Sequence, residues 1–196
     1  MDNLEFVYHS NPHSWFLVAD DLHSQADNLM NSFGSGNLSR KDNHTGRIIS
    51  WDNTSRSAFL LASFALENIL KAFLIYENPG WISNGKLSRR LRTHDLPSLA
   101  KHSNLLPYKE RSLKILSVFN EGNESWARYP CALEKEKTVE PTEMTTKLWA
   151  RYEWLIGAFA KRLVKLLRTY WKGPHGFHGR YEIGGSFLGV DFNCVA

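Results

Sequence analysis

Two charged residues, Glu67 and Lys71, interrupt the most apolar stretch of this sequence, residues 57–77. The acid precedes the base by one helical turn, so on a helix the two side chains share a face and can form an ion pair. Because the stretch is apolar on most sides, it should lie at the centre of a helical bundle. Charged groups in such a place either pair to satisfy the core or line a site that handles a polar ligand, and both interpretations stay open.

Three further residues have side chains suited to recognising phosphates or bases. His94 stands at the start of a short predicted helix, where it can serve as an acid, a base or a phosphate ligand, or can bridge to a neighbouring helix as a structural residue. Arg128 and Tyr129 offer a guanidinium group and an aromatic ring, which suit a phosphate and a base. In the alternative interpretation, Arg128 braces the loop ahead of the final helix.

Helical segments account for most of the chain. Apolar residues recur at three- and four-residue spacing, and capping or helix-breaking residues mark the ends of these segments. Thr93 is the natural N-cap of the short helix that carries His94. The pattern predicts helices over residues 12–33, 57–77, 94–102, 108–120 and 142–171.

Two segments have the composition of loops or turns. Residues 34–56 collect Gly, Ser, Asn, Asp and Arg, and therefore predict an exposed loop. In the tail, residues 173–196, the pair Gly184 and Gly185 separates two short β-prone runs. This arrangement predicts a small hairpin or an arm at the C-terminal end.

The composition is that of a soluble globular protein. The chain has 196 residues, of which 42% are hydrophobic and 13% aromatic, enough for one domain with a substantial core. The net charge of +4 and the pI near 9.1 fit an anionic partner but fall short of a nucleic-acid coat protein. Residues 1–5 lack the features of a secretory signal, and residues 57–77 are too polar for a typical membrane span. We therefore expect a cytoplasmic protein with no membrane association.

Metal and cofactor chemistry find little support in the residue spacing. Cys131 and Cys194 lie far apart and match neither a disulfide framework nor a zinc site. His175 and His178 lack Cys or carboxylate residues at ligand spacing. We expect neither a bound metal nor a cofactor.

Three segments, taken in order, resemble the HEPN domain family, a group of small helical bundles found in prokaryotic toxins, defence proteins and nucleotide-binding modules. They are Ala65–Ala72, Thr93–Leu99 and Trp126–Pro130, and the likeness extends over roughly residues 12–172. The resemblance implies an all-α, up-and-down bundle of four to five helices, commonly a homodimer with a polar cleft. Residues 1–172 would form this bundle, and residues 173–196 would form the tail.

The chain departs from the family at its usual catalytic motif. Many members are metal-independent ribonucleases that use an Arg followed after four to six residues by a His near the start of the final core helix. Arg128 is followed by Tyr129 and Pro130, and no His stands at that distance. The pair Arg89 and His94 matches the spacing but lies at the start of the third helix instead.

The Arg-Tyr-Pro form is similar to the HEPN subgroup that binds nucleotides without cutting nucleic acid. The resemblance therefore implies a nucleotide- or RNA-binding domain of a prokaryotic defence or stress system. Glu67, Lys71, His94, Arg128 and Tyr129 would be its ligand-binding residues.

Two alternatives belong to other functional classes. In the first, the protein is a divergent metal-independent ribonuclease in which His94, Arg128 and Glu67 are catalytic. In the second, it is a non-catalytic dimeric scaffold, for example an antitoxin-like protein, whose polar residues only fix the packing. The Trp residues of the final helix, Trp149, Trp154 and Trp171, are then expected in the core and the dimer interface, although they could also stack against nucleic acid.

Overall fold

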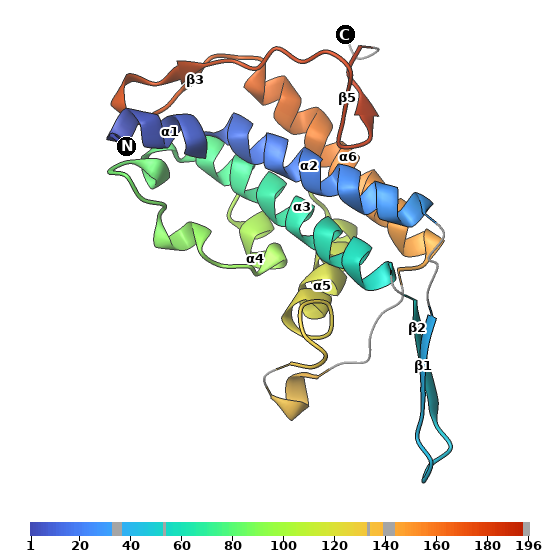
Figure 1. Ribbon diagram of the computed structural model, residues 1–196. Coiled ribbons are helices and arrows are strands. Elements are labelled where there is room, and N and C mark those ends of the chain that lie inside the picture. Colours follow the sequence, from blue (N-terminus) through green and yellow to red (C-terminus); the bar gives the residue numbers. More distant parts are fainter. Residues whose placement is uncertain (33–36, 53, 133, 139–143, 194–196) are drawn as a thin grey trace.

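Three long helices form the body of the structure, a computed structural model that describes residues 1–32, 37–52, 54–132, 134–138 and 144–193. They are α2 (Pro12–Asn31), α3 (Ser55–Glu77) and α6 (Thr146–Leu167), and they lie side by side in Figure 1. The rest of the described chain contributes shorter helices and small antiparallel strand pairs. The mainly helical class that the sequence predicts is thus confirmed.

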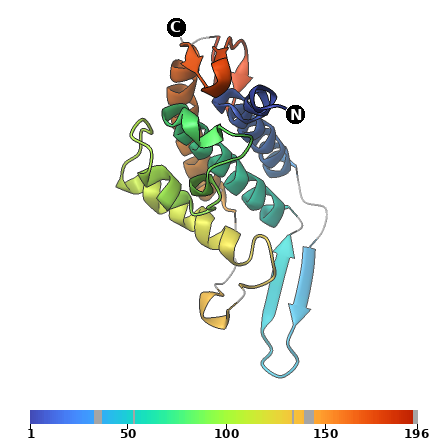
Figure 2. The ribbon, with the colours of Figure 1, turned by 90° about the vertical axis from the view of Figure 1, so that its left-hand side faces the viewer.

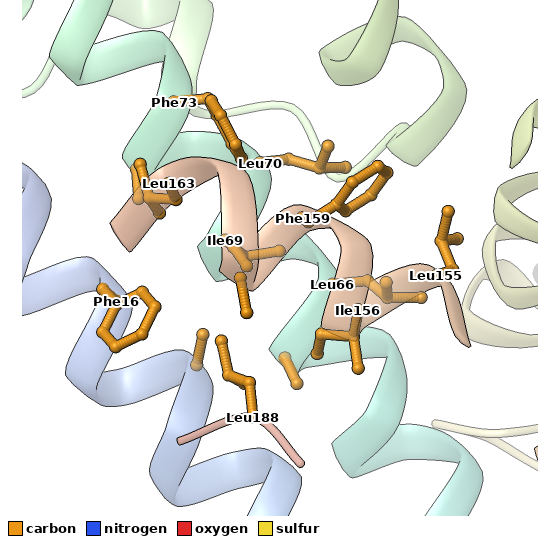
Figure 3. Packing of buried hydrophobic residues seen from close by; sticks show 14 of the residues in the cluster. Phe16, Leu66, Ile69, Leu70, Phe73, Leu155, Ile156, Phe159, Leu163 and Leu188 are labelled. Atoms are coloured by element: carbon orange, nitrogen blue, oxygen red, sulfur yellow. The ribbon is translucent and has the colours of Figure 1, made fainter. Parts of the chain in front are cut away.

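Helix α3 lies at the centre of the bundle because its own side chains are apolar on nearly all faces, so nearly all faces can be buried. Its buried residues run from Ala58 to Ile75, and it contacts α2, α4 (Leu96–Lys101), α5 (Glu110–Glu124) and α6. Figure 3 shows the packing of α3 residues Leu66, Ile69, Leu70 and Phe73 with Leu155, Ile156, Phe159 and Leu163 of α6, Phe16 of α2 and Leu188 of the tail. By length and composition alone α3 could cross a membrane, yet 78% of its apolar window is buried inside the protein, as in the core helix of a soluble protein.

The shorter helices lie close to their predicted positions, with corrected ends. Helix α4 begins at Leu96 because Asp95, and not Thr93, caps it: the Asp95 carboxylate accepts a hydrogen bond from the Ser98 amide at 2.9 Å. Helix α5 continues to Glu124, past the predicted end at residue 120. Helix α1 (Asn3–Ser10) was not predicted, since eight residues carry too short a periodic pattern. The described chain also contains short 3-10 helices, which are η1 (Pro79–Ile82), η2 (Arg89–Leu91), η3 (Lys135–Lys137) and η4 (Pro174–Gly176).

A β-hairpin replaces much of the loop predicted over residues 34–56, so that prediction was wrong here. Strands β1 (Asn37–Lys41) and β2 (Ile48–Asp52) pair in antiparallel register, and the hairpin projects away from the helices in Figures 1 and 2. The Asp42 carboxylate accepts hydrogen bonds from the amides of His44 and Thr45 at 2.8 and 3.0 Å, which closes the turn. Residues 34–36 and 53 of the predicted loop lie outside the described residues.

The tail forms short strand pairs, as the sequence predicts, but with a different turn. Strand β3 (Trp171–Lys172) pairs with β4 (His178–Gly179), and β5 (Ser186–Phe187) pairs with β6 (Val190–Asp191). Leu188 and Gly189, both with positive φ, make the turn of the second pair in place of Gly184 and Gly185. The final helix also ends at Leu167, before the predicted residue 171, and the last predicted tail residues, 194–196, lie outside the described residues.

The second tail hairpin folds back on its own chain. The backbone amide of Leu188 donates a hydrogen bond to the Asp20 carboxylate of α2 at 2.6 Å. The Leu188 side chain is buried in the core between α2 and α6. A polar anchor and an apolar anchor thus hold β5 and β6 against the helices.

Candidate functional site

Glu67 and Lys71 form an ion pair in the interior of the protein. The Lys71 Nζ lies 2.5 Å from the Glu67 Oε1, and the two side chains are 5% and 8% exposed. The ammonium group also lies 5.7 Å from the centroid of the Trp15 ring, within range of a cation–π interaction. The pairing that the sequence predicts is present, and it leaves Lys71 almost no exposed surface with which to meet a ligand.

His94 completes a cluster of three charged or titratable side chains around the Glu67 carboxylate. Its Nδ1 lies 3.0 Å from Oε1 and 2.9 Å from Oε2 of Glu67. A carboxylate only accepts hydrogen bonds, so Nδ1 must carry the proton, and Nε2 is left for other partners. The His94 side chain is 51% exposed, in contrast to its two neighbours.

The local fold explains why His94 reaches Glu67. His94 precedes α4, and the first amide of that helix, at Leu96, donates to the Asn120 side chain of α5 at 3.0 Å. The Thr93 hydroxyl accepts a hydrogen bond from the Asp95 amide at 3.1 Å, which turns the chain just before the helix. These hydrogen bonds position the imidazole of His94 beside the turn of α3 that carries Glu67.

The charges of the cluster balance in one protonation state only. With neutral His94, the Glu67 carboxylate and the Lys71 ammonium cancel, as buried charges require. With protonated His94, the cluster carries one net positive charge, and that charge lies on its most exposed member. The half-exposed imidazole is therefore the part of the cluster that a ligand can reach.

Arg128, which follows α5, packs against the turn of α3 that precedes Glu67, and among the described residues it makes no hydrogen bond or ion pair with the cluster itself. Its guanidinium carbon is 5.6 Å from the centroid of the Phe64 ring, and Phe64 stands one turn before Glu67. Arg128 is exposed, and Tyr129 is 58% exposed. In the described part of the chain, Tyr129 makes no hydrogen bond or ring contact. The structure thus unites Glu67, Lys71 and His94, places Arg128 against the ring of Phe64 one turn before Glu67, and among the described residues shows no contact that joins Tyr129 to them.

Trp126 anchors the segment that carries Arg128. Its ring packs 4.5 Å from the Phe59 ring of α3 and is 3% exposed, and the Ala127 amide donates to the Gly122 carbonyl at 2.8 Å. The segment follows α5 directly and forms a turn at the end of that helix. Arg128 is therefore carried on a segment that Trp126 and Ala127 hold against α3 and α5.

A second buried polar cluster, which the sequence did not predict, joins α2 to α6. His23 Nδ1 lies 3.0 Å from the Tyr152 hydroxyl, and the His23 ring stacks on Trp149 with centroids 6.2 Å apart. Burial lowers the pKa of His23 and raises the pKa of Tyr152 well above its usual value. Burial also raises the pKa of Asp20, although its hydrogen bond from Leu188 opposes the shift.

Gly189 of the tail hairpin closes this second cluster. A Cβ at Gly189 would lie 3.4 Å from His23 Nε2, so the hairpin backbone lies directly against the ring. His23 is only 5% exposed and Tyr152 is fully buried. The one sequence signal for this cluster is a His at helical spacing from the buried Ala19 and Ala26, and this signal does not reveal the distant partner Tyr152.

Within the described ranges, no group of three or more His, Cys, Asp or Glu side chains could hold a metal ion. Compared with known proteins, the chain matches no protein-family model, no curated protein and no solved structure.

Proposed function

We propose that the protein binds a phosphate group of a nucleotide or RNA at the surface formed by His94 and Arg128. One observation carries this proposal: a half-exposed imidazole is held at Nδ1 by a buried carboxylate, with its Nε2 unused by that contact. A carboxylate in the core is costly to desolvate, and clusters of such groups that reach the surface are candidates for functional sites. We also propose that the chain is a HEPN-like helical bundle acting as a cytoplasmic homodimer in a prokaryotic defence or stress system, which rests on the resemblance described above.

The residues of the proposed site have different tasks. Glu67 accepts the hydrogen bond from His94 Nδ1 and so orients the imidazole, which offers its other ring nitrogen to a phosphate oxygen. Lys71 neutralises Glu67 and does not reach the ligand, since its side chain is 5% exposed. Arg128 supplies a planar guanidinium group for bidentate contact with phosphate oxygens. Tyr129, exposed beside it, supplies a ring for stacking with a base.

A metal-independent ribonuclease is the second candidate function, and the Glu67–His94 contact favours it. A carboxylate that fixes the tautomer of an imidazole prepares the other ring nitrogen for general-base catalysis. His94 Nε2 would take the proton of the 2'-hydroxyl, whose oxygen would then bond to phosphorus while the bond from phosphorus to the 5'-oxygen breaks. Arg128 would stabilise the negative charge on the phosphorane oxygens, and water would protonate the departing 5'-oxygen. Incubation of labelled RNA with the protein in EDTA, followed by gel analysis, separates cleavage from binding alone.

Thermal denaturation with ligands tests the proposed binding. Ribonucleoside monophosphates, ATP and a short poly-uridine RNA should include at least one ligand that raises the melting temperature of the wild-type protein. The rise should be lost in His94→Ala and in Arg128→Ala. The exposed residues His9 and Arg40 provide matched controls, so His9→Ala and Arg40→Ala should retain it.

The scaffold alternative gains if no ligand changes the melting temperature and the protein is a dimer by sedimentation. The Trp-rich dimer surface is smaller than the sequence alone implies, because Trp149 and Trp171 are 8% and 3% exposed within a single chain. Trp154, at 43% exposed, is the member of that set that remains at the surface.

A further inference from the structure

Helix α6 carries a regular row of cations on the face opposite its buried side. Lys147, Arg151, Lys161, Lys165 and Arg168 follow one another with Trp154 and Ala158 between them, in alternating steps of four and three residues. This spacing keeps all of them on one side of a helix. The five basic residues are exposed, and residues such as Leu155, Ile156 and Leu163 on the other side are buried against α3.

Carboxylates do not neutralise the middle of this row. Exposed ion pairs occur elsewhere, such as Lys114 with Glu110, but the described residues provide no such partner for Arg151, Lys161 or Lys165. The sole acid of α6, Glu153, falls outside the four-and-three spacing. It lies toward α2, where Asp27 acts on it. The row therefore concentrates positive charge on one face of a chain whose net charge is only +4.

An aromatic ring occupies the gap between the two groups of cations. Trp154 is 43% exposed although it is a large apolar side chain, and the Arg111 guanidinium of α5 lies 4.0 Å from its ring centroid. A guanidinium stacked on an indole adds a further cation to the row and fixes the orientation of the ring. Cations on both sides of a partly exposed aromatic ring are the usual elements of single-stranded nucleic-acid binding.

We propose that a single-stranded polynucleotide binds along this face of α6, with phosphates on the lysines and arginines and a base stacked on Trp154. From Lys147 to Arg168 the row is about 30 Å long, which exceeds the size of a mononucleotide and suits a strand. A membrane surface fits less well, because the apolar face that a lipid-bound amphipathic helix inserts is buried against α3 in this protein. This surface shares no residue with the His94 cluster, and the inference does not depend on the function proposed for that cluster.

Fluorescence anisotropy with labelled poly-uridine RNA and poly-thymidine DNA tests the inference at several salt concentrations. Lys161→Glu/Lys165→Glu should weaken binding by about tenfold or more and reduce the slope of log K against log salt by about 1.4, at about 0.7 for each phosphate contact. The control, Lys86→Glu/Lys135→Glu, removes two exposed lysines outside α6 with the same change of net charge and should bind as the wild type. Comparison of the two strands shows whether the 2'-hydroxyl contributes.

Trp154 provides a second, charge-independent test. Trp154→Ala should weaken strand binding by about tenfold through lost stacking, and Trp154→Phe should retain more of it. All variants change exposed or half-exposed side chains, and unchanged melting temperatures verify that they fold. Equal weakening in the two double-lysine variants would overturn the inference, as would binding to vesicles of anionic lipid with no binding to either strand.

The two sites fail in different ways. His94→Ala should leave strand binding along α6 within about threefold of wild type, since it removes at most one phosphate contact. Loss of strand binding in His94→Ala with full binding in Lys161→Glu/Lys165→Glu would assign the polynucleotide to the His94 site and refute the α6 site. Loss of nucleotide stabilisation with intact strand binding would refute only the function proposed for His94.

Discussion

Two histidine clusters in this protein use similar chemistry in opposite surroundings. Each places an imidazole Nδ1 about 3 Å from an oxygen on a neighbouring helix or segment: the Glu67 carboxylate for His94 and the Tyr152 hydroxyl for His23. His23 is covered by the tail hairpin and is 5% exposed, and the His94 side chain is 51% exposed. The hydrogen bond alone thus does not distinguish a structural histidine from a candidate functional one, and access to solvent does.

The partners of the two histidines differ in a second respect. Tyr152 is neutral, so the His23 cluster needs no counter-ion when its imidazole is neutral. Glu67 is an acid in the core, and Lys71 is required beside it to offset the loss of hydration. A charged arrangement of this kind is therefore more sensitive to the loss of one partner than a neutral one.

Removal of the Glu67 carboxylate should have the largest effect. Glu67→Leu leaves the Lys71 ammonium buried without a partner, so the free energy of unfolding should fall by about 3–5 kcal/mol in urea denaturation. Glu67→Leu/Lys71→Met removes both charges and should recover most of the loss. Glu110→Leu is the matched control, because Glu110 pairs with Lys114 at the same spacing with 82% exposure, and it should cost less than about 1 kcal/mol. Equal losses at Glu67 and Glu110 would show that the inner pair is not buried in solution.

A smaller effect is expected in the neutral cluster. Tyr152→Phe keeps the buried ring and removes the hydroxyl that bonds to His23 Nδ1, so the free energy of unfolding should fall by about 1–2 kcal/mol. Urea denaturation at neutral pH measures the difference. A loss as large as that of Glu67→Leu would show that the neutral cluster depends on its hydrogen bond as strongly as the charged cluster depends on its ion pair.

The sequence predicts these two clusters unequally for a physical reason. Glu67 and Lys71 are visible because charges inside an apolar helical stretch violate its pattern. His23 fits its amphipathic helix, and its partner stands 129 residues away, so only the tertiary fold reveals the contact. The same limit applies to His94, whose link to Glu67 depends on how α4 packs.

The helices and strands likewise divide into those that the sequence predicts and those that it does not. The apolar run of α3 and the periodic pattern of α6 are strong local signals, and both helices are present. The β1–β2 hairpin was missed because strand residues such as Ser39, Arg40 and Ser50 are polar and resemble a loop in composition. Pairing between two exposed strands depends on the turn at Asp42 more than on the strand residues themselves.

The pH dependence of stability also tests the buried cluster of His23 and Tyr152. Burial lowers the pKa of His23 in the folded protein below its usual 6.5, with Asp27 and Asp20 opposing part of the shift. The unfolded chain therefore binds the proton more readily. Stability from this group is complete above pH 6.5 and declines as the pH falls from 6.5 toward the lower folded pKa.

Replacement of His23 tests the direction of this change of stability with pH. Urea denaturation across pH 5 to 7.5 should show a smaller decline in His23→Gln than in the wild type. The decline should not vanish, because burial also lowers the pKa of His13, which contributes with the same sign. Asp20, whose pKa is raised, acts in the opposite direction as the pH rises above 3.8. A decline that is unchanged in His23→Gln would show that His23 is hydrated in the native state.

The smallest change in stability is expected at His94, the exposed member of the comparison. His94→Ala removes a half-exposed partner of Glu67 while Lys71 remains, so the free energy of unfolding should fall by less than about 1 kcal/mol.

The reactivity of the two histidines toward a chemical label should be higher for His94 than for His23. Diethyl pyrocarbonate, followed by peptide mapping, should modify His94 well before His23, because one ring is accessible and the other lies beneath Gly189. The Leu188→Asp variant, which disrupts the apolar anchor of the hairpin, should raise the reactivity of His23 and leave that of His94 unchanged. Equal protection of both rings in the wild type would show that His94 and His23 do not differ in their access to solvent.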